Sequence, residues 1–342
     1  MASPIIRSIE MENFGRIRSF SVNNLSSINL IIGENSSGKT FLLKSLYAAL
    51  KTTEEYKRGD DIRTANDILS DKLRWTFQPE KIGDLVTKGS SEPLRMKLCA
   101  DDSSMDFQFS KDASSKINNV NNTIDRTECN SVFIPAKEVL SLFSIILKTR
   151  EIDRVYGFDD TYYDLVKALR LPPKRGKNYS VLAGSRDKIR KLVNGGVEFD
   201  ETSNRWYYKS GNAKYSIGST AEGIKKIAIL DRLFANGYIG KKSVIFIDEL
   251  ESALHPKAIS DFIDILHDIT ADEMGIQIFI ASHSYFVIKK LYLVAMENRE
   301  HIPCISMNKN GIAVDDLADG MPDNAIINES IRLYEEEVEK VL

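Results

Sequence analysis

The residues of this chain best suited to chemistry form a glycine-rich segment, 33–40, between an apolar run and a helical pattern. The segment fits the motif G-x-x-x-x-G-K-[ST], in which backbone N–H groups and a helix N-terminus surround a polyphosphate. Lys39 could reach the β- and γ-phosphates, and the Thr40 hydroxyl could bind Mg²⁺. We therefore predict a nucleotide site. Its residues are Asn35, Ser36, Ser37, Gly38, Lys39, Thr40 and Phe41.

A second candidate is the pair of carboxylates Asp248 and Glu249, which directly follow the apolar run 243–247. Two acids at the end of a buried strand are costly unless they face a cation or a reacting group. Beside a phosphate-binding loop, Asp248 is the expected partner of Mg²⁺, and Glu249 could orient or deprotonate the attacking water. Without that loop, a solvated strand end would be the better interpretation.

Two weaker signals follow other elements. His283 comes after the apolar run 276–281, at the edge where open α/β sheets bind ligands, and could sense a γ-phosphate or be purely structural. Residues 219–223 form a small-residue turn before a helical pattern. This turn could bind a second phosphate at the helix N-terminus, or Ser219 or Thr220 could simply cap the helix.

The elements that must position these residues alternate between strands and helices, which predicts an α/β fold. An N-terminal β meander is expected over 5–33, a strand pair over 94–109, and a loop over 110–129. Hairpins are expected at 197–208 and 302–314, the second with its turn at 309–311. Single buried strands are expected at 132–135, 243–248 and 276–281. Helices are expected at 41–50, 67–72, 138–171, 221–236, 257–269, 284–297 and from about 324 to 342.

Charge is distributed unevenly along the 342 residues, whose net charge is −3. Residues 137–191 carry 13 Lys+Arg and 7 Asp+Glu, with Arg170, Lys174, Arg175 and Lys177 around a proline pair. This excess could contact a phosphate backbone, although a solvated helical face is the commoner explanation. Residues 315–342 carry 9 Asp+Glu and 2 Lys+Arg, and their apolar stripe repeats every three or four residues. The stripe could pack on the chain's own core, the commoner outcome, or on a partner.

The three cysteines, Cys99, Cys129 and Cys304, are far apart and odd in number, which favours a reducing compartment. Neither a membrane span nor a signal peptide is visible, so we expect a cytoplasmic protein without a membrane partner.

The order of these motifs resembles the ABC-class ATPase heads of the branch that contains RecF, SMC-like and OLD-like ATPases, of the AAA_15/AAA_21 type. The similarity is carried by residues 9–15, by the loop 33–40, and by the run Asp-Glu-Leu-Glu-Ser-Ala-Leu-His-Pro at 248–256. It extends from about residue 5 to about residue 290. The resemblance implies an ABC-type P-loop NTPase head with an N-terminal antiparallel β subdomain.

The resemblance also implies a division of the chain. One head would span 1–342, with an inserted, mostly helical subdomain within 111–215 and a C-terminal hairpin and helix at 300–342. Only 59 residues follow His283 (342 − 283), which leaves no room for the nuclease domain of OLD-like proteins. Any nuclease would then be a separate partner.

By resemblance, Lys39 and Thr40 are the Walker A residues, Asp248 is the Walker B aspartate, Glu249 the catalytic base and His283 the switch histidine. Residues 252–255 match the D-loop. The signature turn is Thr220, Ala221, Glu222 and Gly223. It aligns in two ways, so either Thr220 or Ala221 would contact the γ-phosphate. Gln78 is the candidate for the Q-loop glutamine or, equally, a turn residue before Pro79.

In this class the signature turn of one head closes over the nucleotide of another, so ATP and Mg²⁺ would drive formation of a homodimer. We expect ATP hydrolysis that controls a separately encoded effector, such as a nuclease, in anti-phage defence or genome maintenance. One alternative is an ATP-bound scaffold or inhibitor that holds a toxic effector with little turnover. Another is a RecF-like repair ATPase that binds DNA directly. Turnover with and without DNA would separate the three.

Overall fold

The computed structural model describes residues 5–125, 130–174, 183–308 and 311–341. Its central layer is a six-stranded sheet with the order β14-β13-β3-β12-β11-β7, in which every neighbouring pair is parallel except β13 and β14. Parallel strands end at the same edge of a sheet, so the loops after β3, β7, β11 and β12 lie together. The strands are β3 (Ile28–Gly33), β7 (Val132–Ile134), β11 (Val244–Asp248), β12 (Gln277–Ser282), β13 (Pro303–Asn308) and β14 (Gly311–Asp316).

A second, five-stranded antiparallel sheet has the order β2-β1-β4-β5-β6. The predicted N-terminal meander is therefore wrong in one strand, because β3 leaves it for the central sheet. The physical reason is burial: β3 is buried on both faces, as is usual in a parallel sheet, whereas β1 and β2 also carry exposed residues. The strands of this sheet are β1 (Ser8–Phe14), β2 (Ile17–Val22), β4 (Leu94–Ala100), β5 (Ser103–Phe109) and β6 (Asn119–Asn122).

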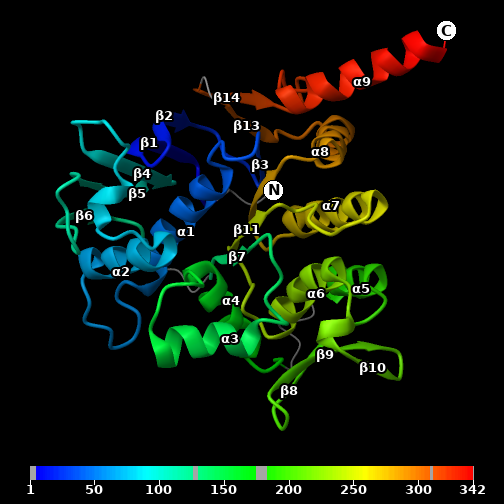
Figure 1. The fold of residues 1–342 in the computed structure, drawn as a ribbon, viewed down its shortest axis with the longest axis horizontal. Helices are drawn as coiled ribbons and strands as arrows, with labels where there is room; N and C mark the ends of the chain where they lie inside the picture. The colour runs from blue at the N-terminus through cyan, green and yellow to red at the C-terminus, as the bar shows by residue number, and fades with distance from the viewer. Residues whose placement is uncertain (1–4, 126–129, 175–182, 309–310, 342) are drawn as a thin grey trace.

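Helix α1 (Lys39–Glu55) packs against both sheets, and its leucines share one core with residues of each (Figure 1). Leu43, for example, belongs to the same cluster as Phe107 of β5 and Phe279 of β12. A second core holds the other face of the central sheet against a group of helices. These are α4 (Asp160–Arg170), α5 (Ala183–Leu192), α6 (Glu222–Ala235), α7 (Pro256–Ala271) and α8 (Tyr285–Asn298). The predicted α/β class is confirmed.

Several predicted elements differ in extent. The helix expected over 138–171 is interrupted: α3 (Phe143–Leu147) continues as a π-helical turn, η2 (Lys148–Asp153), and α4 begins afresh after the N-cap Asp159. The loop expected over 110–129 contains β6. The hairpin at 197–208 gains a third strand, and α2 includes Trp75 and Phe77. These elements are α2 (Ala65–Phe77), η1 (Ile82–Leu85), β8 (Gly196–Asp200), β9 (Arg205–Ser210), β10 (Ala213–Ser216) and η4 (Ile217–Ser219).

Buried ion pairs join α4 to the body. Lys72 of α2 lies 2.7 Å from a carboxylate oxygen of Glu55 and 3.3 Å from one of Asp164, while Arg150 lies 2.6 Å from Asp160. Burial raises the pKa of Asp160 to about 6. The network therefore connects α1, the helix that follows the glycine-rich loop, with α4.

Much of the positive charge of residues 137–191 is paired within the chain. Asp231 forms ion pairs with Arg186 and Arg190, and Lys188 forms an ion pair with Asp268. Of the predicted basic cluster, Arg175 and Lys177 lie outside the described residues, as does Cys129; Cys99 and Cys304 are free thiols. The predicted turn at 309–311 also lies mostly outside them.

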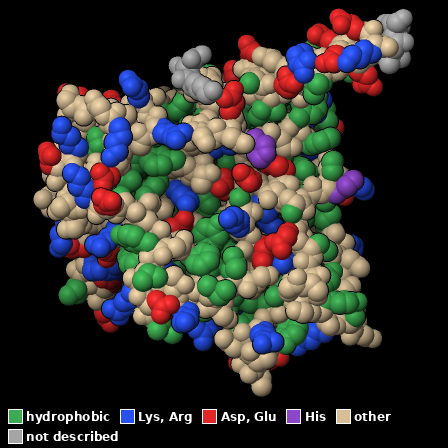
Figure 2. Space-filling model, in the orientation of Figure 1, with side chains coloured by type: hydrophobic (Ala, Val, Ile, Leu, Met, Phe, Trp, Pro, Cys, Tyr) green, Lys and Arg blue, Asp and Glu red, His purple; other side chains and the backbone are tan. Residues whose placement is uncertain are grey.

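Helix α9 (Ala325–Val341) extends away from the body (Figures 1 and 2). Ile327 is buried, but Ile331, Tyr334 and Val338 of the same stripe are 50%, 66% and 37% exposed. The prediction that the whole stripe packs on the chain's own core, the commoner outcome, is therefore wrong for this helix. Across the described ranges, no helix combines the length and apolar character needed to cross a membrane.

Candidate nucleotide-binding site

The glycine-rich loop joins the end of β3 to the start of α1. Gly38 is the N-cap of α1 with φ 109°, a left-handed conformation that glycine adopts at little cost. A Cβ at Gly33 would lie 2.2 Å from the Met307 carbonyl oxygen, so β13 also requires glycine there. No side chain caps α1, which leaves the N–H groups of its first turn open to an anion.

Lys39 is buried against this loop. Its Nζ donates to the carbonyl oxygens of Gly33 at 2.7 Å and Glu34 at 2.9 Å. Burial lowers the pKa of Lys39, and the nearby carboxylates of Asp248, Glu249 and Glu251 oppose that shift. The ammonium is thus held over the loop, within the field of the acids that end β11.

Thr40 and Asp248 meet directly, although 208 positions separate them in the chain. The Thr40 hydroxyl lies 3.0 and 2.9 Å from the two carboxylate oxygens of Asp248, whose side chain is almost fully buried. Burial raises the pKa of Asp248, an effect that the hydrogen bond from Thr40 opposes. A hydroxyl and a carboxylate are the hard oxygen donors that Mg²⁺ prefers, so this donor set fits that ion.

A cavity of about 400 Å³ opens over these groups. Residues of the β1–β2 turn, the glycine-rich loop, α1 and the end of β11 line this cavity. The predicted Glu249 is one of them, and its backbone φ is 47°. Ser37 also lies in the loop, and its buried Oγ has no hydrogen-bond partner among the described residues. The lining residues are Gly15, Arg16, Asn35, Ser36, Gly38, Lys39, Thr40, Phe41 and Glu249.

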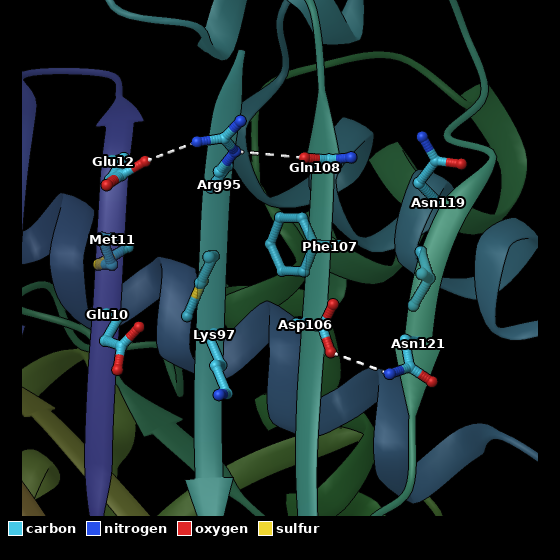
Figure 3. A pocket seen from close by; sticks show the side chains of 12 residues that line it. Glu10, Met11, Glu12, Arg95, Lys97, Asp106, Phe107, Gln108, Asn119 and Asn121 are labelled. Atoms are coloured by element: carbon cyan, nitrogen blue, oxygen red, sulfur yellow. Dashed lines mark hydrogen bonds and ion pairs between the residues drawn. The ribbon is translucent and has the colours of Figure 1, made fainter. Parts of the chain in front are cut away.

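A larger cavity of about 700 Å³ lies on the antiparallel sheet (Figure 3). Its polar side chains largely satisfy one another: Arg95 contacts Glu12 and Gln108, and Asn121 donates to Asp106. It contains neither a glycine-rich loop nor a helix N-terminus. The smaller cavity is therefore the better candidate for a nucleotide.

Sequence reasoning missed two cations of the site. Arg16, in the β1–β2 turn, donates to the Ser36 carbonyl at 2.6 Å and lines the cavity. Lys226 of α6 is buried and donates to the carbonyl oxygens of Asp248, at 2.8 Å, and Glu249. Burial lowers the pKa of Lys226 to about 8. For Lys226, the one signal available in the sequence was a lysine on the apolar face of a helix.

His283 immediately follows β12. The parallel register that pairs Asp248 with Ala281 brings the ends of β11 and β12 side by side. The His283 side chain is 45% exposed, and its Nδ1 lies 3.2 Å from Glu251 Oε1. The histidine is thus at the same sheet edge as the carboxylates.

The predicted signature turn, 220–223, is not part of the lining of the phosphate-loop cavity. The N-cap of α6 is Ala221 without a side-chain hydrogen bond, while the Ser219 and Thr220 hydroxyls donate to the Ser216 carbonyl. Neither hydroxyl therefore caps α6. Glu222, Ser252 and Ala253 instead line a separate cavity of about 330 Å³.

Gly223 packs within its own chain. A Cβ there would lie 2.4 Å from the Ala253 carbonyl oxygen, which belongs to the segment matched with the D-loop. The need for a small residue at 223 therefore exists already in one head, before any second head approaches.

Gln78 is the left-handed C-cap of α2, with φ 52°. Its Nε2 is buried without a partner among the described residues, and it is not one of the residues lining the phosphate-loop cavity. The segment that leaves the sheet beside β11 is instead 136–138, because Ile134 of β7 pairs with Ile247. Lys137 and Glu138 therefore lie at the same sheet edge as the end of β11.

A glycine-rich loop on a parallel sheet, paired with an acid-ended strand and flanked by an antiparallel sheet, defines an ABC-class ATPase head. A family model described as "AAA domain, putative AbiEii toxin, Type IV TA system" matches residues 28–289. The chain belongs to this family, and it is an ABC-class ATPase head.

Individual relatives are distant. "Structural maintenance of chromosomes protein 6" of Dictyostelium discoideum is 27% identical over 208 residues, which are 55% of this chain and 16% of that protein. The chain thus spans under a fifth of its curated relative.

Solved structures share the fold. An SMC head bound to the C-terminal winged-helix domain of ScpA is 13% identical, with a TM-score of 0.55 and coverage of 92% of this chain and 97% of that one. An SMC head with an extended coiled coil, bound to the C-terminal domain of ScpA from Pyrococcus furiosus, is 14% identical, with a TM-score of 0.50 and coverage of 97% and 99%.

Proposed function

We propose that this head binds Mg²⁺ and ATP at the loop 33–40 and hydrolyses ATP there. The observation that carries the proposal is the contact of Thr40 with Asp248 beside a cavity that Lys39, Thr40 and Glu249 line. Bound Mg²⁺ would neutralise charge on the β- and γ-phosphates. Thr40 and Asp248 would hold the ion.

The remaining side chains divide the chemistry between them. Lys39, already held over the loop, would contact the β- and γ-phosphates. Glu249, beside the cavity, would orient or deprotonate the attacking water. His283 would donate a hydrogen bond to the γ-phosphate, and its contribution would grow as charge develops there.

We further propose that ATP joins two heads. Glu222 of the turn 220–223 lines a cavity separate from that of the phosphate loop, and no side chain caps the N-terminus of α6, which suits an anion. Both features support a role toward the nucleotide of a second head. The two residues that compete for the γ-phosphate contact remain Thr220, through its hydroxyl, and Ala221, through backbone groups.

The dimer would control a separately encoded effector in anti-phage defence or genome maintenance. The family description, which names a putative toxin of a toxin–antitoxin system, supports a link to a toxic activity. Direct DNA binding is less favoured, because Arg186, Lys188 and Arg190 are paired within the chain. The division into one head with an insertion at 111–215 and a C-terminal unit at 300–342 remains a proposal.

The test is to measure ATP hydrolysis and molar mass by light scattering on wild type and Glu249→Gln, each with ATP, with ADP and without nucleotide. We expect Glu249→Gln to bind ATP, lose hydrolysis and accumulate as a dimer with ATP alone. Glu273→Gln makes the same chemical change at an exposed position and should behave as wild type. Wild-type turnover by Glu249→Gln would contradict the assignment of the base. One mass in all three conditions would refute ATP-driven dimerisation, and a constitutive oligomer would favour the scaffold alternative.

A further inference from the structure

A third carboxylate, Glu251, lies on the loop after β11 and has no role in the proposal above. Its side chain is only 10% exposed, and both of its oxygens are engaged by the end of the neighbouring strand β12. Oε2 accepts from the Ser282 hydroxyl at 2.9 Å. Oε1 accepts from the backbone N–H of His283 at 2.8 Å and lies 3.2 Å from Nδ1 of the same residue.

These contacts hold His283 at two points, its main chain and its ring. The ring nitrogen Nδ1 faces this carboxylate at 3.2 Å. The other nitrogen, Nε2, lies on the opposite edge of the ring, and the side chain is 45% exposed. Nε2 is therefore the atom left for a ligand, and Glu251 determines which way it faces.

We propose that Glu251 is a positioning residue that fixes the orientation of His283 for its contact with the γ-phosphate. This inference rests on the proposed role of His283. Glu251 also directly precedes the segment 252–255, whose Ala253 packs on Gly223. The same carboxylate thus connects the histidine to the segment that supports the signature turn.

A purely structural role would be to close the end of β12, where the Ser284 N–H also donates to Ser282 Oγ. The two roles differ in what the loss of Glu251 does when His283 is absent. A positioning residue loses its effect in a His283→Ala background, whereas a structural one keeps it.

The experiment measures kcat and KM for ATP on Glu251→Gln, His283→Ala, the double variant and the control Glu273→Gln. Glutamine keeps the shape of the side chain but has one acceptor oxygen instead of two, so it can accept a hydrogen bond from only one of Ser282 and His283. We expect Glu251→Gln to lower kcat about tenfold with KM nearly unchanged, as for the loss of one hydrogen bond to a charged group. In the His283→Ala background the same change should cost less than about twofold.

A second readout does not depend on turnover. The chain has 4 histidines, so ¹⁵N spectra of histidine-labelled protein can resolve the His283 ring. We expect the Nδ1 and Nε2 shifts of His283 to change in Glu251→Gln and to keep their wild-type values in Glu273→Gln. Should Glu251→Gln fail to fold, Ser282→Ala loosens the same carboxylate and should give a smaller fall in kcat, again lost in His283→Ala.

Three outcomes would count against the idea. Equal losses in both backgrounds, or wild-type kcat in Glu251→Gln beside a slow His283→Ala, would overturn the positioning role alone. Wild-type kcat in His283→Ala would instead remove the proposed role of the histidine and, with it, the basis of this inference.

Discussion

Replacing Lys226 by methionine tests how the end of β11 is held. Methionine keeps the unbranched shape but cannot donate to the carbonyl oxygens of Asp248 and Glu249. In the folded protein burial lowers the pKa of Lys226 from 10.5 to about 8, although Asp248, Glu251 and Glu249 act in the opposite direction. The lysine should therefore make the stability of wild type depend on pH in a way that the variant lacks.

The sign follows from proton binding. Between about pH 8 and 10.5 the unfolded chain holds a proton at Lys226 that the folded chain has released, so stability rises with pH across this range. The burial penalty is thus fully present below pH 8 and is relieved as the pH approaches 10.5. At about 1.4 kcal/mol per unit of pKa, the relief is on the order of 3 kcal/mol.

At pH 7 the methionine variant escapes that penalty but leaves two buried carbonyls without their donor, which costs about 1–3 kcal/mol each. We therefore expect Lys226→Met to be moderately destabilised at pH 7. The deficit should grow by about 3 kcal/mol toward pH 10.5. We also expect kcat to fall with little change in KM, since the backbone that carries Glu249 is released.

The assay is urea unfolding, followed by circular dichroism at pH 7, 8, 9 and 10, on wild type, Lys226→Met and Lys257→Met. Lys257 is an exposed lysine of α7, so its variant controls for the loss of one positive charge. The informative quantity is the difference in unfolding free energy between each variant and wild type. A difference for Lys226→Met that stays constant with pH would refute the reasoning.

Two further predictions concern the phosphate loop and the signature turn. Lys39→Ala should abolish ATP binding in equilibrium dialysis, and retained affinity would contradict the phosphate contact. Gly223→Val should lower the melting temperature of the isolated head, because its Cβ would lie 2.4 Å from the Ala253 carbonyl oxygen, and overpacking costs roughly 1–3 kcal/mol. Wild-type melting of Gly223→Val with loss of the ATP dimer alone would show that the glycine serves only a second head.

Local sequence determined the parts of this protein whose physics is local. The conformation of the loop 33–40 depends on its own glycines and on the helix that directly follows, so the motif predicts a phosphate site without knowledge of the rest of the fold. The buried strands 243–248 and 276–281 were visible because an unbroken apolar run needs cover on both faces. The α/β class follows from the alternation of such runs with helical patterns.

The tertiary structure alone decided which distant residues meet. The sheet order brought Thr40 to Asp248 and aligned β7 with β11, so that the segment 136–138 leaves the sheet beside the end of β11, whereas Gln78 does not line the phosphate-loop cavity. Lys226 and Glu251 have ordinary neighbours in the sequence, and their partners lie 22 to 32 positions away.

The apolar stripe on α9 shows the same limit of prediction from sequence. Its spacing specifies an apolar helix face, but three of its side chains remain exposed because no part of the described chain reaches them. A sequence pattern records the preference of a segment for burial. Which surface buries it, and which charge meets which carbonyl, depends on contacts that exist only once the chain is folded.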